Sequence, residues 1–243
     1  MMMNKHSDTF CNINNLGKQS FPYKPTYPIE TPINAFHKYF TTCDRENGVK
    51  ILLNNDNSQV IPGMLRREDA MKIYELAFNT TGNILELGCF RGLSTFIIAK
   101  AILHSNPDKK LTTVDLNAGC VESARRNILT IDQVVNGRIN LLETIVNDGG
   151  SAVSDLIDAG KKYTFAFIDH SHAYKHVLDV CQKLDGVIEP GGFCLFHDYN
   201  DKRNNDDSET GYGVYSAVHD GLNAEVFEFY GCYGCTGLFR KKT

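Results

Sequence analysis

Short runs of largely apolar residues alternate with stretches of helical periodicity over most of the chain. The apolar runs fit buried strands and cover residues 84–87, 111–114, 139–142, 165–168 and 193–196. The stretches between them place apolar residues at helical spacing and predict helices over residues 95–103, 121–129, 152–159 and 177–187. Strands that alternate with helices of this length predict a parallel sheet covered on both faces. The fold class is therefore α/β, doubly wound and Rossmann-like.

Both ends of the chain depart from this alternation. Residues 1–35 are polar, rich in asparagine and interrupted by four prolines, which favours an extended arm over a packed helix. Periodicity predicts a helix over residues 66–78, before the first strand, and another over 213–222. Residues 225–229 and 237–240 predict two strands joined by a glycine-rich turn. They would complete a mostly parallel, seven-stranded sheet with an antiparallel C-terminal hairpin.

Composition narrows the class of partner. With 243 residues, 42% of them apolar, the chain can bury one core, and we expect an arm or cap over residues 1–60 and one domain over 61–243. A net charge of −4 gives no electrostatic reason to bind nucleic acid or an anionic membrane. The sequence shows neither a signal-peptide core nor an apolar run of membrane-spanning length, so we expect a cytoplasmic protein. Cys232 and Cys235 form the one CxxC motif, which we interpret as two ordinary turn cysteines.

The segment ELGCFRGLS, residues 86–94, follows the first predicted strand. Gly88 and Gly92 would let the backbone turn sharply and let a ligand lie against it. The GxxxG spacing differs from the GxGxxG of dinucleotide-binding proteins, and Glu86 would repel a pyrophosphate but suits a sulfonium. Asp115 ends the second strand, where a carboxylate can accept both hydroxyls of a ribose. These residues predict an adenosine-containing ligand.

A second polar cluster follows the fourth and fifth strands. Asp169 and Asp198 end these strands, which lie about 5 Å apart if they are neighbours in the sheet. Two acids that close repel each other unless they are protonated or bridged by a cation, and Mg²⁺ or another hard divalent ion fits such a pair. His197 is a candidate third ligand. His172 has an ordinary pKa near 6.5 and suits a general base at neutral pH.

Together the motifs resemble the class I S-adenosylmethionine-dependent methyltransferases, and within them small-molecule O-methyltransferases of the catechol type and of the macrocin or sugar type. The resemblance runs from about residue 63 to residue 240. Its motifs, in the family's order, are ELGCFRGLS at 86–94, VD at 114–115, IDHSH at 168–172 and EPGG at 189–192. The ordered set is specific, whereas GxxxG alone is weak.

The resemblance implies roles for individual residues. S-adenosylmethionine would be the cofactor, with Asp115 on its ribose and Asp148 near its adenine, in a segment, NDGGS, that departs from the family pattern. The residues around its methionine part would be Glu86, Gly88, Gly92 and Ser94, and Asp169 is also counted among its contacts. A divalent ion would grip the acceptor oxygen, and His172 would remove its proton. The implied partner is a small-molecule acceptor with a hydroxyl group, such as a sugar, a phenol or a natural product.

Two other functions stay open on the sequence. Asp169, His172 and His197 match the two-histidine, one-carboxylate set of iron oxygenases, although those enzymes usually have another fold. A non-catalytic module that only binds an adenosine cofactor is the second alternative. His170 would flank the adenine or face solvent, and His176 is expected at the surface. The sequence identifies neither the acceptor nor the oligomeric state, and a homo-oligomer stays open.

Overall fold

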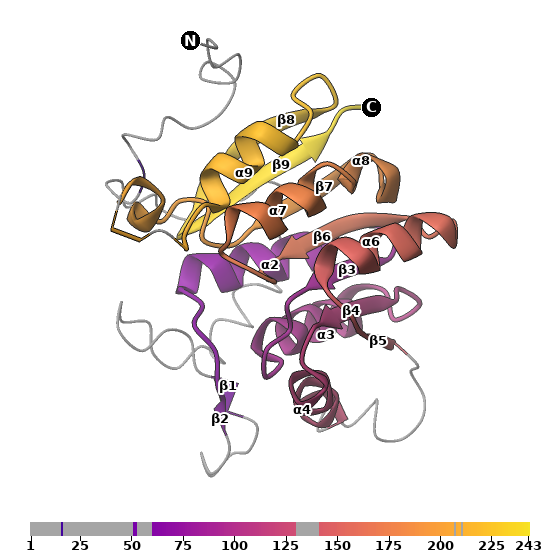
Figure 1. The fold of residues 1–243 in the computed structure, drawn as a ribbon. Coiled ribbons are helices and arrows are strands. Elements are labelled where there is room, and N and C mark those ends of the chain that lie inside the picture. Colours follow the sequence, from indigo (N-terminus) through magenta and orange to yellow (C-terminus); the bar gives the residue numbers. More distant parts are fainter. Residues whose placement is uncertain (1–15, 17–50, 53–59, 130–140, 207, 210) are drawn as a thin grey trace, which may run out of the picture.

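The centre of the molecule is a seven-stranded sheet with helices on both faces (Figure 1). The structure is a computed structural model that describes residues 16, 51–52, 60–129, 141–206, 208–209 and 211–243. The strand order is β5-β4-β3-β6-β7-β9-β8. The first five of these strands in that order run parallel, while β9 pairs antiparallel with both β7 and β8. The doubly wound α/β prediction with its antiparallel finish is confirmed.

The strands of the sheet agree closely with the apolar runs of the sequence. Their bounds are Ile84–Leu87 for β3, Leu111–Asp115 for β4, Leu142–Val146 for β5, Tyr163–Ile168 for β6, Ile188–Phe196 for β7, Phe227–Tyr233 for β8 and Thr236–Lys241 for β9. A separate antiparallel pair consists of β1, Ile51–Leu52, and β2, Val60–Ile61.

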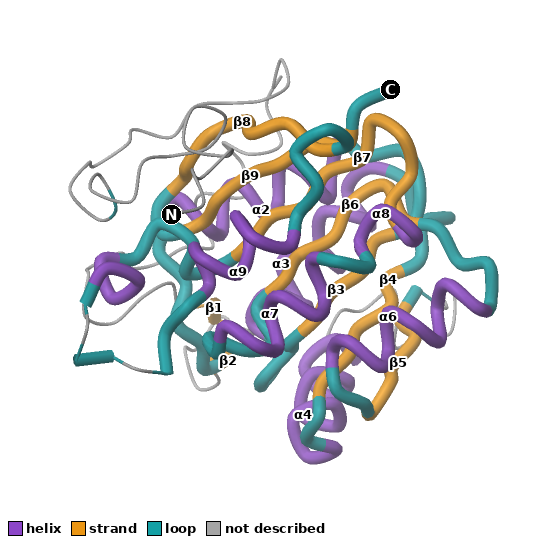
Figure 2. The backbone as a smooth tube through the Cα atoms, turned by 45° about the horizontal axis from the view of Figure 1, so that its top comes forward, coloured by secondary structure: helices purple, strands orange, loops and turns teal. Residues whose placement is uncertain are grey.

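The helices separate into two layers. They are α2 at Arg67–Asn79, α3 at Leu93–Ser105, α4 at Ala118–Leu129, α6 at Gly149–Asp158, α7 at Tyr174–Cys181, α8 at Leu184–Val187 and α9 at Val214–Gly221, with a 3-10 turn, η3, at Lys202–Asn205. Buried residues of α2 and α3 pack with Ile84, Phe165 and Phe167 on one face of the sheet. Those of α6, α7, α8 and α9 pack with Leu85 and Ile168 on the other face. Figure 2 shows these four helices on the same side of the sheet. Because side chains alternate along a strand, one strand supplies both cores.

Three predictions of local structure were wrong in detail. Of the strand expected at 139–142, residues 139–140 lie outside the described residues, Leu141 is not in a strand, and β5 begins at Leu142. This strand forms an edge of the sheet beside β4 and carries polar residues. The strand expected at 193–196 begins earlier, at Ile188, and β7 contains an irregularity in its pairing with β6, where Gly191 has φ 79°. The single helix expected at 177–187 is interrupted between α7 and α8.

Residues 1–60, expected to form an arm, lie mostly outside the described residues. Among the helices of the described ranges, none is long and apolar enough to cross a membrane.

Candidate functional site

A cavity of about 500 Å³ lies at the carboxyl ends of the central strands. This is the position where ligands bind in doubly wound sheets, because the crossover connections change direction there. Met64 and Phe90, both exposed, line it together with the charged groups of three strand ends. The predicted site residues that line it are Gly88, Ser94, Asp115, Asp169, His172, His197 and Asp198. The fold therefore brings residues from distant motifs to one cavity.

The glycine loop joins β3 to α3 and needs glycine at two positions. Gly88 and Gly92 both have φ 90°, in the region that side chains rarely adopt. A Cβ at Gly88 would also overlap the backbone carbonyl of Asp169, and one at Gly92 would lie 2.6 Å from the Cα of Ala124. The two glycines thus set the distance between this loop and its neighbours, and Gly88 also lines the cavity.

Asp115 ends β4 and organises the same loop. Its Oδ2 accepts a hydrogen bond from the backbone N–H of Phe90 at 3.0 Å, and its Oδ1 accepts one from Asn117 at 2.9 Å. Each carboxylate oxygen has a second lone pair, so the group keeps acceptor capacity toward the cavity. Asp115 therefore holds the glycine loop and remains available to a ligand.

A second, smaller hollow of about 180 Å³ continues from the cavity. Gly88, Asp115 and His170 line both spaces, so the two spaces meet at these residues. Asp148 lines the far part and caps α6, where it accepts a hydrogen bond from the Ser151 N–H at 3.0 Å. Leu116, 74% exposed, offers an apolar surface there. The pair of spaces fits an elongated ligand whose middle lies at Asp115.

Glu86 lies beneath the glycine loop and not along either space. The side chain is fully buried, and its Oε2 accepts hydrogen bonds from the hydroxyls of Thr95 at 2.6 Å and Thr113 at 2.5 Å. Burial raises the pKa of Glu86 to about 7, despite the hydroxyl groups that bond to it. The carboxyl group ties the first turn of α3 to β4, and a direct contact between Glu86 and a cofactor stays a prediction.

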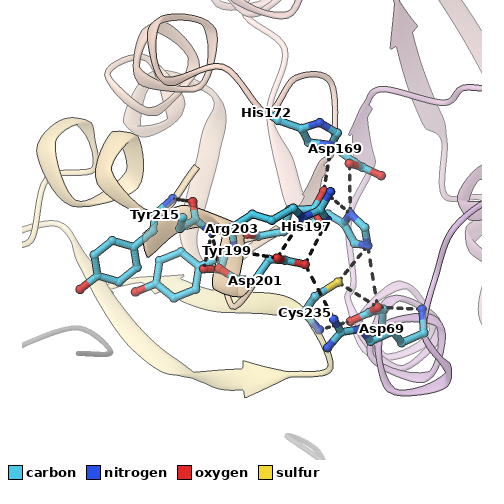
Figure 3. Close-up of polar contacts among 12 residues, drawn as sticks. Asp69, Asp169, His172, His197, Tyr199, Asp201, Arg203, Tyr215 and Cys235 are labelled. Carbon is cyan, nitrogen blue, oxygen red and sulfur yellow. Dashed lines mark hydrogen bonds and ion pairs between the residues drawn. The ribbon is translucent and has the colours of Figure 1, made fainter. Parts of the chain in front are cut away.

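Asp169, His172 and Asp198 converge at the ends of β6 and β7. Their ligand atoms all lie within 4.8 Å of one another. Figure 3 shows Asp169 beside His172. His172 Nε2 lies 2.8 Å from Asp198 Oδ2, and the imidazole stacks on Tyr212 with ring centroids 5.0 Å apart. The hydrogen bond to Asp198 raises the pKa of His172 above its ordinary value. Burial alone would raise the pKa of Asp198, but the interactions with the His172 and His197 imidazoles outweigh it and hold that pKa well below its usual range.

His197 is buried between Asp169 and Asp198 on one side and Asp69 and Cys235 on the other. Its Nδ1 lies 3.2 Å from an oxygen of Asp169 and 3.2 Å from an oxygen of Asp198, in ion-pair contacts without good hydrogen-bond geometry. Its Nε2 lies 3.2 Å from the sulfur of Cys235 and 3.8 Å from Asp69. Burial disfavours the charged imidazole, but Asp169 and the other groups around it outweigh burial and raise the pKa of His197 well above its usual range.

The structure adds residues that the motifs did not indicate. Asp69 comes from the first turn of α2, and Cys235 comes from the turn between β8 and β9. Arg203 forms a two-pronged contact with Asp201, with both N···O distances 3.0 Å, and its guanidinium lies 4.3 Å from the centre of the Tyr212 ring. The CxxC motif was a signal for Cys235, which we interpreted as an ordinary turn residue. The other residues belong to ordinary helix and loop patterns that carried no signal.

The remaining histidines lie apart from the convergent group. His170 borders both spaces, and its Nε2 contacts the backbone carbonyl of His176 at 3.3 Å. Burial lowers the pKa of His170, which favours a neutral ring. His176 is exposed at the first turn of α7. The segment from Asp169 to Ala173 is a loop, because α7 begins at Tyr174.

Residues 85–199 match the sequence profile of a family described as a methyltransferase domain. Among curated proteins, none matches the chain. An O-methyltransferase, TomG from Streptomyces achromogenes, involved in tomaymycin synthesis and solved with S-adenosylmethionine, is similar in structure with TM-score 0.56 and 18% identity over 72% of this chain and 79% of that one. An O-methyltransferase from Bacillus cereus, solved with S-adenosylhomocysteine, has TM-score 0.56 and 14% identity over 71% and 78% of the two chains. A methyltransferase from Geobacter sulfurreducens has TM-score 0.52 and 15% identity over 74% and 80%.

Proposed function

We propose that this chain is an S-adenosylmethionine-dependent methyltransferase of the class I fold, and that it methylates a hydroxyl oxygen of a small molecule with the help of a divalent cation. The observation that supports this proposal most strongly is the position of the Asp169, His172 and Asp198 group. It borders the large cavity, which continues past Asp115 into the second hollow. A cofactor and an acceptor can therefore lie side by side at the strand ends.

The two spaces fit the parts of the cofactor. The methionine part would lie in the large cavity beside Gly88 and Ser94, and the ribose hydroxyls would bond to Asp115 where the spaces meet. The adenine would occupy the smaller hollow, between Leu116 and Asp148. S-adenosylmethionine carries the positive sulfonium whose methyl group is transferred. Asp169, directly after the carboxyl end of β6, contributes negative charge to this part of the cavity.

His172 is the proposed general base. Its Nε2–H donates to Asp198, which fixes the ring and leaves Nδ1 as the basic nitrogen of the neutral imidazole. About half of the side chain is exposed and borders the cavity, so an acceptor hydroxyl can reach it. The role of the ring is to take the hydroxyl proton as the oxygen attacks the methyl carbon in line with the sulfur.

The residues at the same strand ends also fit a divalent ion. Asp169 and Asp198 supply oxygen donors that suit Mg²⁺ or Mn²⁺ with retained waters, and His172 is the third member of the convergent group. A bound ion would lower the pKa of the acceptor hydroxyl. The convergent set contains two carboxylates and one histidine, so it differs from the two-histidine, one-carboxylate set of iron oxygenases.

The direct experiment is a methyl-transfer assay with labelled S-adenosylmethionine against panels of phenols, sugars and other hydroxyl compounds. We expect transfer to at least one hydroxyl acceptor and a Kd for S-adenosylhomocysteine in the micromolar range by calorimetry. Transfer only to amines, or to no acceptor despite cofactor binding, would contradict O-methylation. Lack of cofactor binding would contradict the whole proposal.

A further inference from the structure

A second group of possible metal ligands lies behind the site, deeper in the protein. It consists of Asp69, His197 and Cys235, which we call the inner trio (Figure 3). The three side chains are buried, with 0%, 7% and 3% of their surface exposed. They come from three segments, namely the first turn of α2, the end of β7 and the turn before β9. Tertiary folding alone brings an oxygen, a nitrogen and a sulfur donor together here.

The spacing of these donor atoms matches a tetrahedral zinc site. Cys235 Sγ lies 3.2 Å from His197 Nε2 and 3.2 Å from Asp69 Oδ2. His197 Nε2 lies 3.8 Å from Asp69 Oδ2. Zinc bonds of about 2.3 Å to sulfur and about 2.0–2.2 Å to nitrogen and oxygen separate tetrahedral donors by about 3.3–3.6 Å. Shifts of a few tenths of an ångström would bring all three atoms to bonding distance of one ion.

The surroundings of His197 resemble those of a metal-binding histidine. A histidine that binds a metal through one nitrogen usually directs its other N–H to a carboxylate, which fixes the ring. Here the Nε2 of His197 faces Asp69 and Cys235, while its Nδ1 lies 3.2 Å from oxygens of both Asp169 and Asp198. The carboxylates of Asp169 and Asp198 would then orient the His197 ring from the cavity side.

The trio is closed on one side and open on the other. Asp69 is anchored by the N–H groups of Arg66 and Cys235, each 2.8 Å from one of its oxygens. Cys235 and His197 line the 500 Å³ cavity, so a water molecule or ligand atom can reach the fourth position from there. Three protein ligands with one open position are typical of catalytic zinc, whereas structural zinc usually has four protein ligands.

We propose that Asp69 Oδ2, His197 Nε2 and Cys235 Sγ bind one zinc-type ion at the base of the cavity, next to the site of methyl transfer. Cys235 would bind as the thiolate and His197 through a deprotonated Nε2, so each loses a proton to solvent as the ion enters. Sulfur selects a borderline ion such as Zn²⁺ or Co²⁺ over Mg²⁺. The ion would join α2 to the β8–β9 turn and hold His197 toward the two strand-end acids. This binding is independent of whether the chain transfers methyl groups.

The test uses the full chain, stripped with a chelator and titrated with Co²⁺ and then with Zn²⁺ against a competing dye. We expect one equivalent of Co²⁺ with intense thiolate charge-transfer absorption, displaced by Zn²⁺, and a higher Tm with zinc. Cys235→Ser should abolish the absorption and weaken zinc binding at least about tenfold. Cys120→Ser, which removes a thiol from another cavity, and His172→Ala, which alters only the outer group, should both keep the absorption.

A second readout uses the unmodified chain, so it does not depend on whether a variant folds. In the unmodified chain, zinc should slow alkylation of Cys235 by at least about tenfold, measured by mass spectrometry, and leave Cys120 unchanged. Absorption that persists in Cys235→Ser, or that disappears in His172→Ala, would assign the ion elsewhere and overturn the proposal. Absence of bound Co²⁺ together with unprotected Cys235 would identify the trio as a network of hydrogen bonds only.

Discussion

The imidazole of His172 is hydrogen-bonded to the carboxylate of Asp198, with Nε2 2.8 Å from Oδ2. The two residues come from different loops, since one follows β6 and the other follows β7. Asp198 has φ 59°, an unusual value for an aspartate, and its carboxylate is 7% exposed while the imidazole is 51% exposed. A buried acid therefore holds an accessible base at the rim of the cavity. This pair is the centre of the first prediction.

His172→Ala should lower kcat by roughly 10²–10⁴ and leave the affinity for S-adenosylhomocysteine unchanged, because the general base acts on the acceptor and not on the cofactor. Stopped assays measure kcat, and calorimetry measures the affinity for S-adenosylhomocysteine. His176→Ala is the matched control, since His176 lies four residues further on, in the first turn of α7, and is exposed and outside the convergent group. Equal kcat for His172→Ala and the parent enzyme would exclude this base.

The pH profile tests the same pair in another way. Because the bond to Asp198 raises the pKa of His172, the imidazole stays protonated to a pH above its ordinary value near 6.5. A protonated imidazole cannot accept the hydroxyl proton, so kcat should fall as the pH drops through that raised pKa. The acidic limb should therefore lie above pH 6.5 and be absent in His172→Ala. A limb that is unchanged in the variant would belong to another group.

Asp115→Asn should weaken the binding of S-adenosylhomocysteine at least about tenfold, or about 1.4 kcal/mol, because a charged acceptor is lost from the ribose contact. The asparagine keeps one carbonyl oxygen for the loop N–H groups, whereas Asp115→Ala would also free Phe90 and Asn117. Calorimetry should therefore show a larger loss for Ala than for Asn. An affinity for Asp115→Asn equal to that of the parent would rule out the ribose contact.

The strands and their alternation with helices could be predicted because they depend on local patterns. Apolar runs of four or more residues marked β3, β4, β6 and β7, and polar residues directly after them mark the carboxyl ends where parallel strands expose ligand sites. Strand β5 was misplaced because its sequence, LETIV, carries less apolar signal than the run INLL at 139–142, which ends at the first residue of the strand. The pattern alone could not distinguish the two registers.

The inner part of the site could not be predicted, for a different reason. Asp69 looks like an ordinary acid in the first turn of a helix, and Cys235 looks like a turn residue. Their contact joins positions 166 residues apart and depends on how α2 packs against the β8–β9 turn. No periodicity or spacing encodes such a contact. The motifs therefore indicated the outer group, while the packing of the whole domain forms the inner trio.

Gly88→Ala should abolish measurable cofactor binding and lower the Tm, because the new Cβ would overlap the Asp169 carbonyl at a φ of 90°. Gly160→Ala is a control for backbone strain without steric overlap, since Gly160 has φ 66° and no atom lies within 4 Å of the Cβ that alanine would add. That control should lose about 1–2 kcal/mol of unfolding free energy from backbone strain and keep cofactor affinity. Thermal scans and calorimetry on both variants make the comparison. Similar binding by the two proteins would show that the close approach at Gly88 is dispensable.

The last prediction concerns the divalent ion at the outer group. Arg203 lies 3.6 Å from Asp198, and His172 and His197 lie within 3.2 Å of it, so cations already surround this carboxylate. We therefore expect weak metal binding that EDTA removes, with loss of methyl transfer and recovery on addition of Mg²⁺ or Mn²⁺.

Two comparisons separate this ion from any bound deeper in the protein. Asp169→Asn should raise the Mg²⁺ concentration needed for half-maximal rate at least about tenfold, because one oxygen ligand loses its charge, whereas Cys235→Ser should not change it, since sulfur is a poor ligand for Mg²⁺. Cofactor affinity, measured in parallel, controls for damage to the cavity. If turnover stays complete in excess EDTA, the His172–Asp198 pair deprotonates the acceptor without a metal, and Asp169 acts through its charge alone.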